Sequence, residues 1–433
     1  MLARLVEAIV PRRLGTSYRW LLGAVWTMNL GDGLLLAAGP LLVAARTEDA
    51  FLVALAALVE WLPPLLFGLW AGALTDRLDR RRLVISVDVA RIVVLAGLAL
   101  AVVLDAAPIA LVLVALFLIG TAETFADNTT ATLTPMLVDR RDLVVANARS
   151  QAGFIGMNQL AGPPIGAALF AFAQFSPVAV DAVLIAAGTV LISRVRLPSH
   201  GAAPDERPRT WEAVAEGLRW VLHHAAVRTL VLTILIFNVT YGAAWSVLVL
   251  YARDHLGLGA VGYGLITTVI AVGGLAGVLG YGWLTRHVTL ANLMRIGLVI
   301  ETFTHLCLAL TRTPWVAMGI FFVFGAHAFV WGTTSMTVRQ RAVPTELQGR
   351  VGSVNLVGTF GGLVVGAAIG GALAQHLGVT APFWFAFAGS ALFVALIWRQ
   401  LRHIQHADER DEPLAAPGPT PADPAHDVTP AGG

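Results

Sequence analysis

The sequence predicts an all-α protein that crosses a membrane many times. Hydrophobic residues make up 57% of its 433 residues and charged residues only 13%, about half the charged fraction of an ordinary globular chain. The apolar residues gather in long segments, and one bilayer crossing needs about 20 such residues in a helix. This composition excludes a nucleic-acid-binding or collagen-like protein, and a single cysteine excludes an internal disulfide.

Twelve apolar segments can be distinguished, each long enough to form a membrane-spanning helix. A helix satisfies its own backbone hydrogen bonds, as the lipid interior requires. In chain order the segments cover residues 18–44, 50–74, 83–104, 109–128, 148–172, 176–195, 228–252, 259–284, 290–311, 315–338, 348–375 and 380–400. We therefore expect twelve transmembrane helices.

The placement of arginine predicts the orientation. All 29 basic residues are arginines, and basic residues favour cytoplasmic loops. With twelve spans and a cytoplasmic N-terminus, only Arg46, Arg253 and Arg312 fall in outer loops. The sequence thus predicts a multi-pass protein of the cell inner (plasma) membrane, with both termini in the cytoplasm.

A polar stretch after the sixth segment divides the chain into two halves. We expect a six-helix bundle over residues 1–195, a cytoplasmic linker over 196–227 and a second six-helix bundle over 228–406. Apolar residues recur at helical spacing within the linker, which predicts an amphipathic helix on the membrane surface. Residues 407–433, rich in Pro, Ala, Gly and Asp, are expected to form a disordered cytoplasmic tail.

The two halves share a sequence pattern. An offset of 200 residues aligns Gly162 with Gly362 and Gly166 with Gly366, and each second glycine is followed by two alanines. Many secondary transporters consist of such repeats, with a binding site near the midplane between them. The pattern predicts a site between the two halves.

The most specific motif follows the second segment. Residues 72–81 read Gly-Ala-Leu-Thr-Asp-Arg-Leu-Asp-Arg-Arg and resemble a signature of the major facilitator superfamily, Gly-x-Leu-x-Asp-Arg-x-Gly-Arg-Arg/Lys. The chain departs from it at Asp79, where the family glycine serves a left-handed turn that Asp tolerates. The resemblance implies a cytoplasmic gate. Gly72 would allow close helix approach, Asp76 would face a helix N-terminus, and Arg77 and Arg80 would pair with carboxylates.

A further pair is expected to belong to this gate. Asp127 lies at the cytoplasmic end of the fourth segment, and Arg91 lies inside the cytoplasmic third of the third. We expect Asp127 to form a structural ion pair with Arg91 or with Arg77.

Other segments narrow the resemblance. Residues 29–33 read Asn-Leu-Gly-Asp-Gly, residues 120–127 read Gly-Thr-Ala-Glu-Thr-Phe-Ala-Asp, and residues 349–351 read Gly-Arg-Val. Together they look like the bacterial exporters grouped with enterobactin and macrolide efflux proteins. The resemblance implies export of a small amphipathic molecule (a drug, siderophore or secondary metabolite) by proton antiport with alternating access. It implies a monomer with no cofactor and no bound metal.

The fifth segment contains a candidate hinge. Gly162-Pro163-Pro164-Ile165-Gly166-Ala167 is similar to a Gly-Pro-x-x-Gly-Gly feature of proton-linked drug exporters. Small residues allow close helix contact, and proline removes a backbone donor and kinks a helix. Gly162, Pro163 and Gly166 are the predicted hinge, and ordinary small-residue packing is the alternative.

Ionisable residues inside a bilayer are costly and are therefore candidates for proton coupling or substrate binding. The candidates are Asp32, Glu60, Glu123, Glu301 and His305. Asp32 ranks first, because two glycines flank it and its own segment contains no nearby arginine. Each of the others could simply bond a neighbouring helix.

The residues that line a cavity are harder to predict. Polar and aromatic residues near the middle of their segments are the candidates: Asn29, Asn238, Tyr241, Trp245, Asn355 and Phe360. Aromatic rings beside an acid suit large apolar or cationic molecules. Lipid-facing or interhelix packing accounts for any one of them equally well.

Three alternatives to an exporter remain open. A proton-linked or facilitated importer would share the same fold. An intramembrane prenyltransferase is weakly suggested by two acid pairs, Glu123 with Asp127 and Asp76 with Asp79, without the expected paired Asp-rich motifs. A non-transporting sensor would not need the gate motif. The expected partners are a small-molecule substrate, protons and the lipid bilayer.

Overall fold

The computed structural model describes residues 12–197 and 210–398. Every regular element within these ranges is a helix, which confirms the all-α prediction. Ten of the described helices are long and apolar enough to cross a membrane. The predicted disordered tail and part of the predicted linker lie outside the described residues.

The first half of the chain contains seven α-helices, two short 3-10 turns and one π-helical segment. They are a turn at Arg12–Leu14, α2 (Thr16–Ala44), α3 (Ala50–Arg77), α4 (Arg80–Val103), α5 (Ile109–Leu137), a turn at Arg140–Asp142, α6 (Leu143–Gly153), the π-helical η3 (Phe154–Ala161), α7 (Gly162–Phe172) and α8 (Ser176–Ser193).

The second half begins with the helix predicted in the linker. Its elements are α9 (Thr210–His223), α10 (Ala225–Trp245), α11 (Leu248–Leu250), the π-helical η4 (Tyr251–His255), α12 (Ala260–His287), α13 (Leu290–Leu310), α14 (Pro314–Ala342), a 3-10 turn at Thr345–Leu347, α15 (Gln348–Leu377) and α16 (Ala381–Ile397). Each predicted apolar segment coincides with one helix or with a run of consecutive helices.

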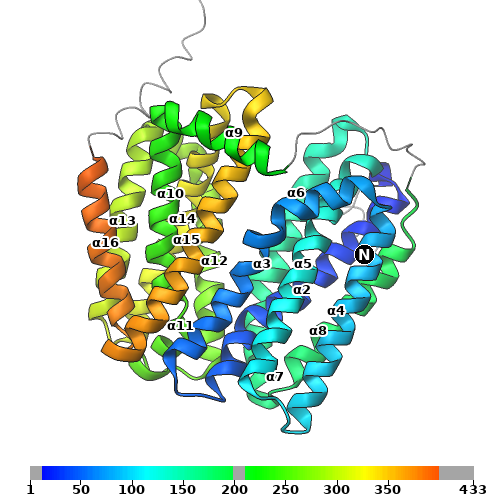
Figure 1. Ribbon diagram of the computed structural model, residues 1–433, viewed down its shortest axis with the longest axis horizontal. Coiled ribbons are helices and arrows are strands. Elements are labelled where there is room, and N and C mark those ends of the chain that lie inside the picture. The colour runs from blue at the N-terminus through cyan, green and yellow to red at the C-terminus, as the bar shows by residue number, and fades with distance from the viewer. Residues whose placement is uncertain (1–11, 198–209, 399–433) are drawn as a thin grey trace, which may run out of the picture.

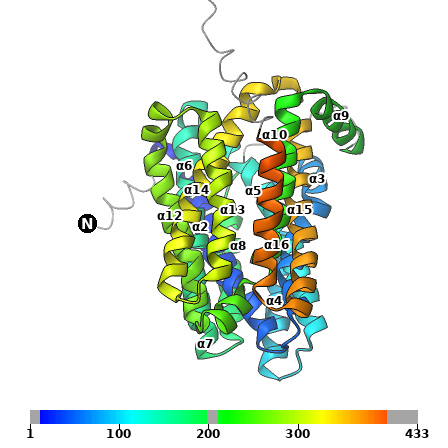
Figure 2. The ribbon, with the colours of Figure 1, turned by 90° about the vertical axis from the view of Figure 1, so that its left-hand side faces the viewer.

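The helices pack into two groups, which lie side by side in Figure 1. In the first group α2 contacts α7 and α8, and α5 contacts α3 and α4. In the second group α10 contacts α15 and α16, and α14 contacts α12 and α13; Figure 2 views this group from the front. The groups meet mainly through two helix pairs, α3 with α15 and α7 with α12.

Repeated glycines hold the first helix of each group against a later one. A Cβ on Gly162 would lie 2.5 Å from the Cα of Gly33, and one on Gly362 would lie 2.6 Å from the carbonyl oxygen of Leu235. Gly166 and Gly366 likewise press against backbone carbonyls, of α2 and α10 respectively. The glycines aligned by the 200-residue offset therefore make equivalent backbone contacts.

The fifth apolar segment is interrupted by a π-helix. Pro163 and Pro164 begin α7 without backbone N–H groups, so two carbonyls of the preceding turn lose their usual partners. The turn before them widens into η3, as π-bulges do within α-helices. One freed carbonyl, that of Leu160, accepts a hydrogen bond from the Thr268 hydroxyl of α12 at 3.1 Å.

Asp79 corrects one sequence expectation. The residue has φ −62° rather than a left-handed conformation, and its carboxylate accepts a hydrogen bond from the backbone N–H of Arg82 at 2.8 Å. It is the N-cap of α4, a position at which aspartate is among the preferred residues. The departure from the family glycine therefore supplies a helix cap.

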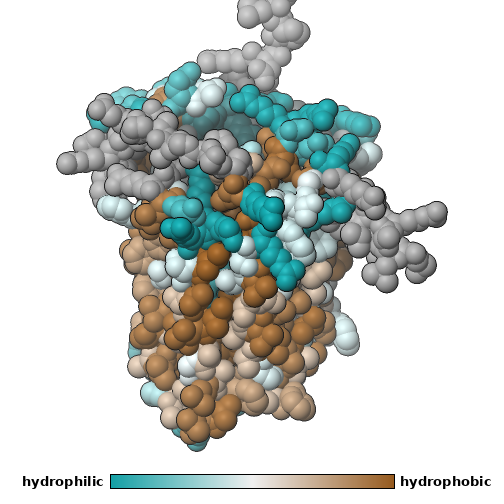
Figure 3. Space-filling model, turned by 90° about the vertical axis from the view of Figure 1, so that its right-hand side faces the viewer, coloured by the Kyte–Doolittle hydropathy of each residue, from teal (hydrophilic) through white to brown (hydrophobic). Residues whose placement is uncertain are grey.

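The surface is consistent with a lipid environment. Figure 3 shows apolar side chains around the middle and lower part of the viewed face, and hydrophilic residues towards the end at which α6 and α9 lie. Large apolar side chains such as Leu279 and Val183 are 78% and 67% exposed. Exposure of this size and extent marks a surface that contacts lipid or another apolar partner.

Candidate functional site

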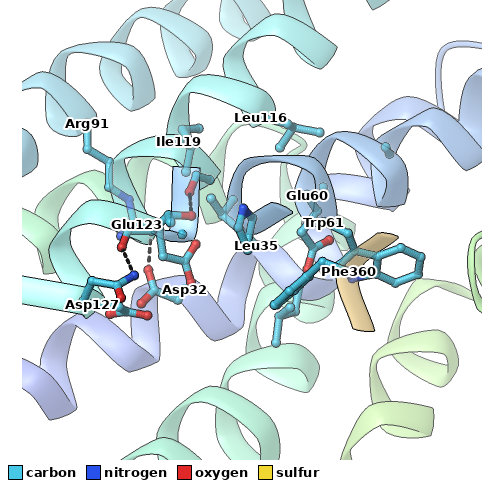
Figure 4. A pocket seen from close by; sticks show the side chains of 18 of the residues that line it. Asp32, Leu35, Glu60, Trp61, Arg91, Leu116, Ile119, Glu123, Asp127 and Phe360 are labelled. Atoms are coloured by element: carbon cyan, nitrogen blue, oxygen red, sulfur yellow. Dashed lines mark hydrogen bonds and ion pairs between the residues drawn. The ribbon is translucent and has the colours of Figure 1, made fainter. Parts of the chain in front are cut away.

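A cavity of about 370 Å³ lies among α2, α3, α4 and α5 and reaches α15 of the second group. Four carboxylates and one arginine line it: Asp32, Glu60, Glu123, Asp127 and Arg91. Figure 4 shows Arg91, Asp32, Glu123 and Asp127 towards one end, and Glu60, Trp61 and Phe360 towards the other. The predicted coupling candidates Asp32, Glu60 and Glu123 thus share one cavity.

Arg91 of α4 is the centre of the charged end. Its Nη2 forms an ion pair with the Oδ1 of Asp32 on α2, and lies 3.8 Å from the Oδ2 of Asp181 on α8. Arg91, Asp32 and Asp181 are 3%, 8% and 0% exposed. One buried cation therefore stands between two buried carboxylates, which lowers the cost of burying each of them.

Two of these contacts were missed in the sequence. The partner of Asp32 comes from a different helix, so the absence of arginine in the segment of Asp32 did not mean that Asp32 is unpaired. Asp181 is the only charged residue between Ser176 and Ser193 of an apolar segment, and the rule that singled out Asp32 would have identified it too.

More acids surround the central arginine. Glu123 lies within electrostatic range of Arg91. Asp127 is exposed to the cavity. Asp88, one turn before Arg91 on α4, is buried, and one of its oxygens lies 3.4 Å from the hydroxyl of Thr189. With one arginine among these carboxylates, the charged end favours positive charge, whether a proton or a cationic group.

The opposite end of the cavity is largely apolar. Glu60 lies there with Trp61 of its own helix and Phe360 of α15. Within the described chain no hydrogen bond or ion pair reaches the Glu60 carboxylate. An acid beside two aromatic rings suits an amphipathic molecule that carries a positive group.

The second group contains a separate buried cluster. The Nε2 of His327 on α14 lies 3.8 Å from the Oε2 of Glu301 on α13. His305, one turn after Glu301, is fully buried with its ring edge-on to Trp245 at 5.9 Å between centroids. Glu301 and His305 do not line the cavity, and His327, the partner of Glu301, was not predicted.

Most of the residues predicted to line a cavity lie away from this one. Of the six candidates only Phe360 is among its lining residues. The side-chain amides of Asn29 and Asn238 instead donate to carbonyls one turn earlier in their own helices, at 2.8 and 2.7 Å. Tyr241 stacks on Trp245 with ring centroids 4.3 Å apart. Asn355 is half-buried, and its Oδ1 is without a hydrogen-bond partner in the described chain.

The predicted gate is only partly formed. A Cβ on Gly72 would meet nothing within 4 Å, so no helix approaches closely there, contrary to expectation. The Arg80 Nη1 lies 2.8 Å from the Met136 Sδ. The side chains of Asp76 and Arg77 lie outside what the structure describes.

Arg91 and Asp127 belong to the cavity rather than to the gate. Arg91 turns towards Asp32 and Asp181, and no ion pair with Asp127 is found for it among the described residues. The other expected partner of Asp127, the side chain of Arg77, lies outside the described residues. The physical reason is depth: the guanidinium lies among buried carboxylates that need a cation more than the exposed Asp127 does.

Comparison with known protein families identifies the chain. A family model described as transmembrane secretion effector matches residues 9–427. The chain belongs to this family, a branch of the major facilitator superfamily. It is therefore a multi-pass membrane transporter, as the motif at residues 72–81 indicated.

Two characterised relatives are similar over most of their length. The multidrug efflux pump Tap of Mycolicibacterium fortuitum is 27% identical over 413 residues, which cover 91% of this chain and 97% of that protein. Macrolide efflux protein A of Streptococcus pyogenes is 22% identical over 375 residues, which cover 84% of this chain and 90% of that protein.

Solved structures share the fold. A bacterial homologue of the iron transporter ferroportin in an inward-facing state superposes with a TM-score of 0.72 at 17% identity, covering 89% of this chain and 98% of that chain. The nucleoside transporter NupG gives a TM-score of 0.68 at 12% identity, covering 90% of this chain and 100% of that chain. At these identities the likeness concerns the fold alone.

Proposed function

We propose that the protein exports a small amphipathic molecule across the plasma membrane by proton antiport, as a monomer. The observation that carries the proposal is the buried ion pair of Asp32 with Arg91 at the wall of a cavity that both helix groups line. The relatives named as multidrug and macrolide efflux pumps support the direction. An enzymatic role has no support from a family of transporters.

The architecture that accompanies this proposal has twelve crossings. Ten crossings are the ten long helices. The continuous run α6, η3 and α7 forms the fifth crossing, and α16 forms the twelfth. The 17 residues of α16 extend about 25 Å at 1.5 Å per residue, close to the bilayer core of about 30 Å. The contacts within each helix group support two six-helix bundles, which we assign to residues 1–195 and 228–406. The distribution of arginine supports a cytoplasmic location of both termini.

The proposed orientation makes this an inward-open arrangement. At the end that would face outwards, the groups are tied together. Arg253 donates to the carbonyl of Ala44 at 3.1 Å, and the Gln375 side-chain carbonyl accepts from the backbone N–H of Ala50 at 2.8 Å. At the other end Gly72 faces open space. The gate of residues 72–81 would close when the outer end opens.

Asp32 is the proposed exchange site for proton and substrate. In the outward-open state it would take up a proton, which neutralises the carboxylate and weakens its pair with Arg91. In the inward-open state it would lose that proton to the cytoplasm, so that the negative cavity can bind a cationic or amphipathic substrate. One proton moving down 100 mV supplies about 2.3 kcal/mol, enough for more than a tenfold gradient of a neutral solute.

Inside-out vesicles test direction and coupling together. Their lumen corresponds to the cell exterior, so an exporter with an acidic lumen should accumulate ethidium or erythromycin inside. Asp32→Asn should abolish the response to the pH gradient while retaining binding. Asp142→Asn, which removes a buried carboxylate paired with Arg13 outside the cavity, is the matched control. Accumulation that ignores the gradient in the wild type, or persists unchanged in Asp32→Asn, would refute the proposal.

A further inference from the structure

We infer that Asp181 is the alternate partner of Arg91, which receives the guanidinium whenever Asp32 becomes protonated. Asp181 is therefore a positioning residue that permits the proton to bind. This inference rests on the proposed role of Asp32 in proton coupling.

The geometry places Asp181 ready for this role. The Nη2 of Arg91 that pairs with Asp32 lies 3.8 Å from the Oδ2 of Asp181. Charge-assisted hydrogen bonds of this type measure about 2.7–2.9 Å, so a shift of about 1 Å would complete a second pair. Neither oxygen of the fully buried Asp181 has a hydrogen-bond partner in the described chain. A buried carboxylate left in this way favours the arrival of a donor.

The packing of α2 against α8 keeps Asp181 in place. A Cβ on Gly31 would clash with the Oδ1 of Asp181, so glycine directly before Asp32 leaves room for this carboxylate in its present position. On the other side of Asp32, Gly33 packs against the backbone of Asn158 in η3. The two glycines that flank Asp32 thus let one carboxylate and one helix turn approach it from opposite sides.

The energetic reason concerns the arginine. When Asp32 binds a proton, Arg91 loses its charged partner in a buried place, and an unpaired buried charge is strongly destabilising. Transfer of the guanidinium to Asp181 keeps one ion pair in both protonation states. Without Asp181 the proton on Asp32 would leave Arg91 unpaired, and proton binding would require a more acidic solution.

Other titratable groups near Arg91 are less suited to the role. Asp88 lies on the same helix, and one of its oxygens is within reach of the Thr189 hydroxyl. Glu123 and Asp127 approach from α5 and line the cavity, where substrate and water reach them. Asp181 is the second carboxylate in ion-pair range of Arg91 in the described chain, and it does not line the cavity.

Infrared difference spectroscopy on the purified full-length protein tests the inference without any substrate. The C=O band of a protonated carboxyl that disappears in Asp32→Asn is assigned to Asp32. In Asp181→Asn this band should appear only at proton concentrations at least about tenfold higher, which is one pH unit. Asp181→Glu should bring the titration of the Asp32 band most of the way back to that of the wild type. Asp142→Asn should leave the titration of this band unchanged.

Two outcomes would overturn the inference. One is an Asp32 band that titrates in Asp181→Asn as in the wild type. The other is an equal shift in the titration of the Asp32 band when Asp181→Asn is added to Arg91→Gln, because a simple field effect of Asp181 does not need the arginine. The double variant removes both members of the Arg91–Asp181 pair, so this comparison remains possible if Asp181→Asn alone fails to fold. If Asp32→Asn keeps full gradient-driven transport, the proposed function fails instead.

Discussion

The two halves of the molecule repeat a backbone arrangement but not its chemistry. In each half a pair of glycines four residues apart presses the fifth or eleventh apolar segment onto the first helix of that half, through Gly162 and Gly166 or through Gly362 and Gly366. Side chains at these contacts would separate the helices, which is why small residues recur in transmembrane interfaces. The packing is symmetric.

The differences lie in the groups that the arrangement positions. The first half interrupts its fifth segment with η3, whereas α15 is an uninterrupted helix of 30 residues. The first half buries Arg91 between Asp32 and Asp181. The second half buries an acid against a histidine, and aromatic rings pack in tilted and edge-on contacts beside that histidine. The repeated scaffold thus positions an arginine between two carboxylates in the first half, and an acid, a histidine and aromatic rings in the second.

The largest expected effect comes from removing the central cation. Arg91→Gln leaves Asp32 and Asp181 buried without their partner, and loss of one member of a buried pair costs about 3–5 kcal/mol. Arg295→Gln, in the second half, removes an arginine that packs over the ring of Trp398 at 5.9 Å and should cost less than about 1 kcal/mol. Unfolding titrations of the two variants in detergent measure the difference in their free energies of unfolding. Equal losses of stability would contradict the proposed difference between the two halves.

The repeated glycines should behave alike in the two halves. Gly166→Ala and Gly366→Ala each force a methyl group into a backbone carbonyl, and overpacking of this kind costs about 1–3 kcal/mol. Gly97→Ala and Gly319→Ala are matched controls, since a Cβ at either position meets nothing within 4 Å and alanine favours helix. Thermal unfolding should show that Gly166→Ala and Gly366→Ala lower the stability by similar amounts. A loss of stability in only one of them would contradict the packing symmetry.

The buried acids of the two halves should differ in their effect on coupling. Asp32→Asn is expected to abolish gradient-driven accumulation. Glu301→Gln, which breaks the contact with His327 in the second half, should change it by less than about threefold, equivalent to roughly 0.6 kcal/mol. Parallel uptake measurements in inside-out vesicles decide this. Loss of coupling in Glu301→Gln would indicate that the proton site lies in the second half, or includes residues of that half.

The smallest effect is expected where the linker meets the second half. Glu216 of α9 forms an ion pair with Arg350 at the start of α15, and both side chains are partly exposed. Exposed pairs contribute about 0–1 kcal/mol, so Glu216→Gln should scarcely change the unfolding midpoint. A loss of several kcal/mol would indicate that α9 holds the second half together.

The sequence predicted what depends on local pattern. Apolar run length located the helices, helical spacing found α9, and the repeat offset identified glycines that occupy equivalent positions in the two halves. Contacts between helices were beyond it, because no local pattern says which face of α4 meets α2. The pairing of Arg91 with Asp32 and the places of Asp181 and His327 were therefore missed. The close approach expected at Gly72 was also wrong for this structure, because it depends on which helix lies opposite Gly72 and no local pattern specifies that.

The most direct test of the central claim is proton release on substrate binding. Purified protein in weakly buffered detergent solution, mixed with ethidium or erythromycin in the presence of a pH indicator, should release about one proton per bound molecule if Asp32 exchanges one for the other. Asp32→Asn should bind the compound and release none, while Glu301→Gln should release as the wild type does. Undiminished proton release from Asp32→Asn would contradict the account.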